Sequence, residues 1–252
     1  MIQMSKYKIY LEYMVCSFVE PSKIKEWIEI CTLMKTIDSM VCLTFSPTHL
    51  TIQMSHPSRK CILDMSFPST WFSDYDWKDS EFYIDTDTLF TIFSLYSDEK
   101  MISMECDKNF LVLKFFHDQH IKSFSIPLRN HRERRIPIVH EEGISFRMDT
   151  HYIYPICQQL YKFGDILYFV IRKEYFHMIS FGTEKMIVEV QPSALEVITE
   201  GECDKSYELY FLNLFLKFSI LYPKINIKMN TLLHLSIEKE YILNYYVCRV
   251  KS

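Results

Sequence analysis

The chain has 252 residues, of which 48% are hydrophobic and 24% charged, and its formal net charge is −4 at pH 7. This composition is typical of a folded globular protein with room for two domains, and a protein that binds nucleic acid by overall charge would instead be basic. No apolar run approaches the roughly 20 residues that a bilayer-spanning helix requires, so we expect no contact with a membrane.

The first half of the chain alternates strand and helix patterns. Pro21 suits the first turn of a helix, and the Ser-Pro-Thr turn between two alternating runs is typical of a hairpin. In chain order we predict a strand at 6–19, a helix at 21–36, strands at 40–45, 49–54 and 60–67, an edge strand or loop at 71–78, a strand at 81–85, a helix capped by Asp87 through residue 96, and strands at 101–106, 110–116 and 121–127.

The second half repeats this order. Pro155 falls inside its first predicted helix, where proline is tolerated only near the first turn. We predict a strand at 144–148, a helix at 150–163, strands at 166–171, 176–181, 186–190, 195–199 and 207–210, a helix at 211–220, and strands at 224–229, 232–237 and 241–250.

A charged, aperiodic stretch separates the two halves, from Ile126 to Phe146 (IPLRNHRERRIPIVHEEGISF). Pro127 and Pro137 argue against a regular element there, so the stretch is either a solvated surface loop or the joint of a duplication. Helix-then-strand patterns at 30–45 and 88–105 recur at 156–171 and 211–229. This internal repeat favours the joint.

We therefore predict an α+β fold of two similar β/α domains, with four helices and many antiparallel strands. The expected boundaries are 1–127 for the N-terminal domain, 128–143 for the connector and 144–252 for the C-terminal domain. We expect no catalytic residue, metal site or cofactor, because four glycines cannot build a phosphate loop and the histidines and eight scattered cysteines lack ligand spacing. An enzyme is thus not the expected function.

Several motifs resemble the eukaryotic sliding-clamp superfamily, which includes proliferating cell nuclear antigen (PCNA) and the subunits of the nine-one-one checkpoint clamp. LYFLNLFLKF at 209–218 resembles a helix of the replicative clamp, and RIPIVHEE at 135–142 resembles the end of its interdomain connector. QMSHPSR at 53–59 departs from the replicative pattern. The WFSDY run at 71–75, MVCLTFSPTHL at 40–50 and EFYID at 81–85 are more similar to the Rad and Hus types of checkpoint subunit.

The resemblance implies a PCNA-like ring of about three chains, with helices lining a hole around duplex DNA and antiparallel sheets outside. It implies two further clamp subunits, in a homo- or heterotrimer, a clamp loader, and polymerase, repair or checkpoint proteins that dock through a hydrophobic peptide motif. A nuclear location is expected, or a viral replication compartment if the chain is viral.

The resemblance also places DNA contact on the helices, because the family's connector runs over the outer surface. The lysines expected to bind phosphates are Lys23, Lys25, Lys35, Lys162 and Lys217. The linker holds Arg129, Arg132, Arg134 and Arg135, and we expect its basic run at 131–135 to favour partners with acidic residues beside a hydrophobic anchor.

A peptide pocket is expected between the linker and the C-terminal strand. The predicted walls are Met54, Ile62, Ile136, Pro137, Ile138, Leu232, Tyr245 and Tyr246, with the alternative that Ile62 and Tyr245 are ordinary core residues. Because helix lysines are sparse, a checkpoint-clamp subunit that shares a ring with more basic partners is favoured. A divergent replicative homotrimer, or a scaffold or viral factor with the fold but without the ring, remain the alternatives.

Overall fold

The structure is a computed structural model that describes residues 14–107, 109–129, 135–139 and 141–250. The first half contains β1 (Met14–Phe18), α1 (Pro21–Ile37), β2 (Met40–Phe45), β3 (His49–Ser55), β4 (Cys61–Pro68), the 3-10 helix η1 (Ser69–Trp71), β5 (Asp74–Asp76), β6 (Ser80–Asp85), α2 (Thr86–Phe93), β7 (Met101–Asp107), β8 (Phe110–Phe116) and β9 (Ile121–Pro127).

The second half contains the same elements in the same order. They are β10 (Ile144–Asp149), α3 (Thr150–Leu160), β11 (Ile166–Ile171), β12 (Phe176–Phe181), β13 (Lys185–Glu189), η2 (Pro192–Ala194), β14 (Leu195–Thr199), β15 (Cys203–Glu208), α4 (Leu209–Ser219), β16 (Lys224–Met229), β17 (Leu232–Glu238) and β18 (Ile242–Cys248). Each element of the first half therefore has a repeat-equivalent in the second.

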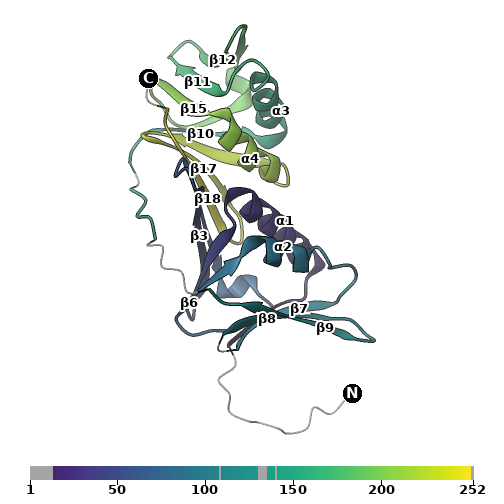
Figure 1. The fold of residues 1–252 in the computed structure, drawn as a ribbon. Coiled ribbons are helices and arrows are strands. Elements are labelled where there is room, and N and C mark those ends of the chain that lie inside the picture. The colour runs from purple at the N-terminus through teal and green to yellow at the C-terminus, as the bar shows by residue number, and fades with distance from the viewer. Residues whose placement is uncertain (1–13, 108, 130–134, 140, 251–252) are drawn as a thin grey trace.

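The strands form three antiparallel sheets whose order follows the repeat (Figure 1). The first half gives the five-stranded sheet β5-β1-β7-β8-β9 and the second half gives the four-stranded sheet β13-β12-β11-β15. The remaining strands form a nine-stranded sheet, β14-β10-β16-β17-β18-β4-β3-β2-β6. The pairing of β18 with β4, from Ile242 opposite Ser66 to Val247 opposite Cys61, joins the two halves.

The four helices pack on one side of the nine-stranded sheet (Figure 1). Strand residues alternate between two faces, so every second side chain of β3, β4, β17 and β18 points into the core beneath the helices. Trp27 of α1 is fully buried and lies 5.4 Å from the ring of Phe67 on β4. Burial of each large side chain contributes about 2–3 kcal/mol, so this layer is a main source of stability.

A partly buried polar contact ties the two halves together at the helices. The hydroxyl of Tyr222, which follows α4, donates to Glu26 Oε1 of α1 at 2.6 Å. The hydroxyl of Tyr241 contacts the same oxygen at 3.1 Å, and Lys239 Nζ lies 3.4 Å from it. The carboxylate of one half therefore bonds to polar groups of the other, which offsets the cost of its partial burial.

The predicted α+β fold of two similar halves with four helices is confirmed, and several element ends differ from the prediction. Asp85 caps α2, because its carboxylate accepts from the Thr88 amide at 2.7 Å, and the predicted cap Asp87 lies in the first turn. Both α2 and α3 end about three residues early, where the backbone continues as i→i+3 turns at Tyr96 and Phe163. The strand predicted at 207–210 lies instead at Cys203–Glu208, and the early part of the first predicted strand lies outside the described residues.

All eight cysteines are free thiols. In the part of the chain that the structure describes, no helix has the length and apolar character needed to span a membrane.

Candidate functional site

We call residues 128–143 the linker, and its described parts (128–129, 135–139 and 141–143) lie at the outer face of the nine-stranded sheet, on the side opposite the helices (Figure 1). Gln53 of β3 holds its middle with two hydrogen bonds: the Ile136 amide donates to Gln53 Oε1 at 2.7 Å, and Gln53 Nε2 donates to the Ile136 carbonyl at 3.2 Å. Arg135 lies 3.5 Å from Asp64 of β4. The side-chain amide of Gln53 thus bonds to both backbone polar groups of Ile136, as a neighbouring strand would.

A second set of contacts fixes the end of the linker before β10. Asn230 Nδ2 donates to the Glu141 carbonyl at 3.1 Å, and Thr231 Oγ1 donates to the Glu141 carboxylate at 2.8 Å. The linker is also held at its start, where the Arg129 amide donates to the Tyr83 carbonyl at 2.8 Å. Exposed Val139 lies between the contacts at Ile136 and Glu141.

A groove of about 940 Å³ opens between the linker and the outer face of the first half, and we call it the large groove. Its lining includes Cys42, Gln53, Ile62, Tyr83, Ile136 and Pro137. Burial raises the pKa of the Cys42 thiol, so this cysteine is protonated at neutral pH. The large groove is therefore a mixed apolar and polar surface without a reactive nucleophile at this position.

A smaller hollow of about 420 Å³ lies on the other side of the linker, between Ile138 and Tyr246 of β18. The Tyr246 ring stacks on His234 of β17, with ring centroids 4.5 Å apart. Burial, and the nearby charge of Asp64, raise the pKa of Tyr246 to about 12. The phenol therefore stays neutral at pH 7, and its hydroxyl can donate and accept hydrogen bonds at the edge of the smaller hollow.

The structure brings six of the eight predicted pocket residues to the outer face. Ile62, Ile136 and Pro137 line the large groove, whereas Ile138 lines the smaller hollow. Tyr246 lines the hollow and also an adjacent recess, which it shares with Leu232.

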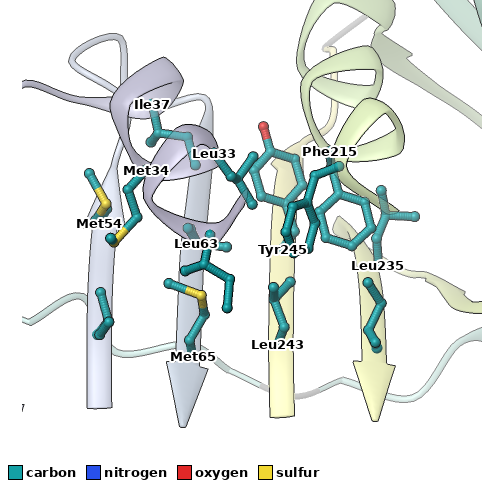
Figure 2. Close-up of a cluster of buried hydrophobic side chains, with 14 of the residues drawn as sticks. Leu33, Met34, Ile37, Met54, Leu63, Met65, Phe215, Leu235, Leu243 and Tyr245 are labelled. Carbon is teal, nitrogen blue, oxygen red and sulfur yellow. The ribbon is translucent and has the colours of Figure 1, made fainter. Parts of the chain in front are cut away.

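Tyr245 is a core residue, which is the alternative left open for it, and Met54 borders the large groove although its side chain points to the helices (Figure 2). Met54 borders the large groove but is only 4% exposed, and its side chain points toward Met34 of α1. Tyr245 is fully buried and stacks on Phe215 of α4, with centroids 5.1 Å apart. Neighbouring residues of a strand face opposite ways, so Tyr245 and Tyr246 could not both line one pocket.

Sequence reasoning missed the polar side of the large groove, which includes Gln53, Tyr83 and Arg59. The alternation of β2 and β3 carried a signal for it, because residues between the buried positions must face outward. Arg59, in the turn after β3, has φ of 57°, a left-handed conformation that costs a non-glycine residue about 1–2 kcal/mol. This turn places an exposed guanidinium at the edge of the groove.

On the opposite side, the exposed surface of α1–α4 forms what we call the helix face. Lys23 Nζ lies 3.2 Å from both Glu20 and Glu240 and donates to the Trp71 carbonyl at 3.0 Å. Burial alone would lower the pKa of Lys23, but its hydrogen bonds to these two glutamates raise it above the ordinary value. This lysine is positively charged and already neutralised within the chain.

The other predicted lysines differ in their surroundings. Lys35 lies 3.0 Å from Asp87 of α2 and 4.5 Å above the Phe90 ring. Lys25, Lys162 and Lys217 are exposed, and no described residue forms an ion pair with them. Within the described residues, no group of three or more His, Cys, Asp or Glu side chains is placed to hold a metal ion.

Comparison with solved structures gives close matches in fold. PCNA from Entamoeba histolytica aligns over 94% of this chain and 99% of its own, with a TM-score of 0.85 and 11% sequence identity. The chain has the PCNA-like sliding-clamp fold. A structure of the PCNA2–PCNA3 complex from Sulfolobus tokodaii aligns over the same shares, with a TM-score of 0.82 and 15% identity. Neither a protein-family model nor a curated relative matches the sequence.

The predicted resemblance to the clamp superfamily is thus confirmed in the fold. In a clamp fold the helix face and the linker face are the two sides of one subunit. The predicted lysines lie on or beside the helices, and the hydrophobic linker residues lie on the other side. Arg132 and Arg134 of the basic linker run lie outside the described residues.

Proposed function

We propose that this chain is a subunit of a DNA sliding clamp, which closes into a ring around duplex DNA and tethers partner proteins to it. The observation that carries the proposal is the way the two halves join. β18 of the second half pairs with β4 of the first. The repeat-equivalents of these strands are β9 and β13, and each is the outer strand of its sheet.

The repeat therefore indicates which strands of two neighbouring subunits would pair. If β9 of one chain pairs with β13 of the next as β18 pairs with β4 within the chain, subunits join head to tail through heterologous contacts. Such contacts close into a ring when the rotation between subunits allows it. The clamp fold supports closure, and the resemblance to the clamp superfamily supports about three subunits.

The two edges carry matching side chains. On β9, Phe124 packs on buried Phe115 at 5.4 Å and Ile126 is buried, so both lie on the helix side. On β13, Met186 and Val188 also pack partly against the core. In the internal joint the corresponding positions are the buried, apolar residues of β18 and β4. Pairing the free edges would extend this apolar layer across a subunit boundary and cover two exposed backbone edges.

The outer face supports the tethering role. The large groove and the smaller hollow lie on either side of a linker that Gln53 and Asn230 hold in place. An extended peptide with aliphatic and aromatic anchors fits a concave surface of this size and composition. We propose that polymerase, repair or checkpoint proteins dock there, in the nucleus or in a viral replication compartment, after a loader places the ring on DNA.

The scarcity of free cations on the helix face supports one branch of the superfamily, the heteromeric checkpoint clamp. Two of the five predicted lysines, Lys23 and Lys35, are engaged in ion pairs within the chain. In a homotrimer this shortage would be repeated in every subunit, whereas more basic partners could compensate for it in a heterotrimer. The matching apolar edges support the alternative, a replicative homotrimer.

Native mass spectrometry of the purified chain, alone and with Val188→Lys, tests the assembly. We expect the wild type to form a closed oligomer, alone or after addition of its partner subunits, and Val188→Lys to lose it because a charge enters the apolar joint. The matched control is Val197→Lys on β14, an exposed valine at an edge that the repeat leaves unpaired. A chain that never assembles, or a loss caused equally by both variants, would contradict the proposal.

A further inference from the structure

The charges of the helix face are divided unequally between the two halves of the chain. The helices of the first half carry three lysines and three acids: Lys23, Lys25 and Lys35, and Glu26, Glu29 and Asp87. The helices of the second half carry no acid. Their cations are Lys217 within α4 and Lys162, two residues beyond the end of α3.

In the first half, nearly every lysine has an acidic neighbour. Lys23 contacts Glu20 and Glu240, and Lys35 contacts Asp87. Lys25 stands one helical turn before exposed Glu29, a spacing at which side chains are neighbours. A phosphate that approached α1 and α2 would have to displace these carboxylates or accept repulsion from them.

In the second half, hydrogen-bond donors line up without acids. Tyr210, Asn213 and Lys217 recur at spacings of three and four residues, so they share one stripe along α4. Tyr210 is 45% exposed and Lys217 is exposed. On the neighbouring helix α3, Gln158 is exposed, and Lys162 follows it one turn later.

The acids that precede these two helices are already occupied. The Asp149 carboxylate accepts from the His151 amide at 2.8 Å, capping α3. Glu208, before α4, pairs with Lys60 of the first half. Asp165, an exposed acid, follows Lys162 by three residues, and its carbonyl accepts from the Leu209 amide at the start of α4. The other polar groups of this surface, Lys162, Lys217 and the Tyr210 hydroxyl, are donors that suit a phosphate oxygen.

Building on the clamp function proposed above, we propose that the second half alone binds the DNA backbone. The binding track consists of Lys162, Lys217 and the hydroxyl of Tyr210, while the first half faces DNA without binding it. Each lysine that neutralises a phosphate adds roughly 0.9 to the magnitude of the slope of log K against log salt concentration. The two lysines of one subunit would therefore contribute about 1.8. Such a contact is weak and independent of sequence, as a ring that slides requires.

The test measures binding of a fluorescein-labelled duplex of random sequence by anisotropy, between about 50 and 200 mM salt. The assembled protein is compared with Lys162→Gln/Lys217→Gln and with the matched control Lys25→Gln/Lys35→Gln, which removes the same charge from the first half. We expect the first variant to lower the salt slope by about 1.8 per subunit and the control to leave it unchanged. Tyr210→Phe should weaken binding roughly two- to tenfold through loss of one hydrogen bond.

Thermal melting and native mass of both variants show that fold and assembly persist. If the wild type forms a ring and binds DNA but the control lowers the slope as much as the Lys162/Lys217 variant, the assignment to the second half is overturned while the clamp function stands. A ring whose binding depends only on Lys25 and Lys35 would overturn it in the same way. If the wild type binds no DNA at any salt concentration, both proposals fail together.

Discussion

Among single residues, Gln53 fixes the middle of the linker to the outer face. Its side chain makes two hydrogen bonds to Ile136 and a third, at 3.3 Å, to Asp64. These contacts hold the linker at the distance from the sheet that leaves the large groove open. The sequence did not mark this residue, because glutamine on a strand is ordinarily a solvated side chain.

Gln53→Ala should release the middle of the linker. Each lost hydrogen bond is worth about 0.5–1.5 kcal/mol, and Ile136 is only half-buried, so we expect a loss of about 1 kcal/mol in the free energy of unfolding. Amide exchange at Ile136 and Ile138 should become faster. Thr51→Ala, on the same face of β3, is the control, and equal exchange in the two variants would contradict this role for Gln53.

The sequence alone does not show which face of the sheet each strand residue lies on, and this limited the prediction of the site. The hydrophobic character of Ile136, Pro137 and Ile138 was enough to place them on the candidate site. It was not enough to decide between wall and core for Tyr245, because an apolar residue in a strand suits the core as well as a pocket wall. A shift of one residue in register exchanges the two faces, and the sequence of an isolated strand does not fix that register.

Among the elements, the edge strand β9 pairs with β8, and an ion pair to a buried carboxylate also ties β9 to the segment between α2 and β7. Glu99, between α2 and β7, is only 2% exposed, and its carboxylate accepts from Lys122 Nζ of β9 at 2.6 Å. The Ser97 amide also donates to it at 2.8 Å. This pair fixes β9 in the position from which it would join a second subunit.

Acid should weaken this anchor. Burial alone would raise the pKa of Glu99, but hydrogen bonds from Lys122 and the Ser97 amide lower it to about 2. A depressed pKa in the folded state means that the stabilisation is complete above the ordinary value of 4.5 and is lost as pH falls from there toward about 2. We expect Glu99→Gln to remove a pH-dependent stability on the order of 2 kcal/mol in this window, measured by urea unfolding. The role of Glu99 would be refuted if the free energy of unfolding fell with pH equally steeply in wild type and variant below pH 4.5.

The linker should act as one wall of the docking surface. Ile136→Asp with Ile138→Asp puts two charges beside the groove and the hollow, and should abolish binding of a peptide with aliphatic and aromatic anchors while the melting temperature stays close to that of the wild type. Ile198→Asp, an exposed isoleucine on β14, is the control. Fluorescence titration measures the affinity, and unchanged binding by the double variant would remove this surface from the proposed function.

Most elements could be predicted from hydrophobic periodicity, because α1, β2, β8 and β16 each keep one period over their whole length. The ends of α2 and α3 could not, since their last turns keep the helical pattern of side chains while the backbone bonds shift from i→i+4 to i→i+3. Local pattern thus identifies an element more reliably than it identifies its last residue.

At the scale of the whole molecule, the duplication was visible in the sequence, but the way the halves join was not. The β18–β4 pair links residues about 180 positions apart, and nothing in the periodicity of either strand selects its partner. Once that pair is known, the repeat gives the unpaired equivalents β9 and β13, and from them the proposed ring. In the proposed ring, these edges join the subunits around DNA.

Retention on linear duplex DNA with blocked ends distinguishes a closed ring from an open DNA-binding surface. The assembled protein is allowed to thread onto the DNA, both ends are then capped with a bulky protein, and the complex is washed with salt high enough to cancel phosphate contacts. We expect retention on capped DNA and loss from uncapped DNA under the same wash, because a ring leaves only over an end. Equal loss from both would show that the chain binds DNA at most as an open surface, and would contradict the clamp.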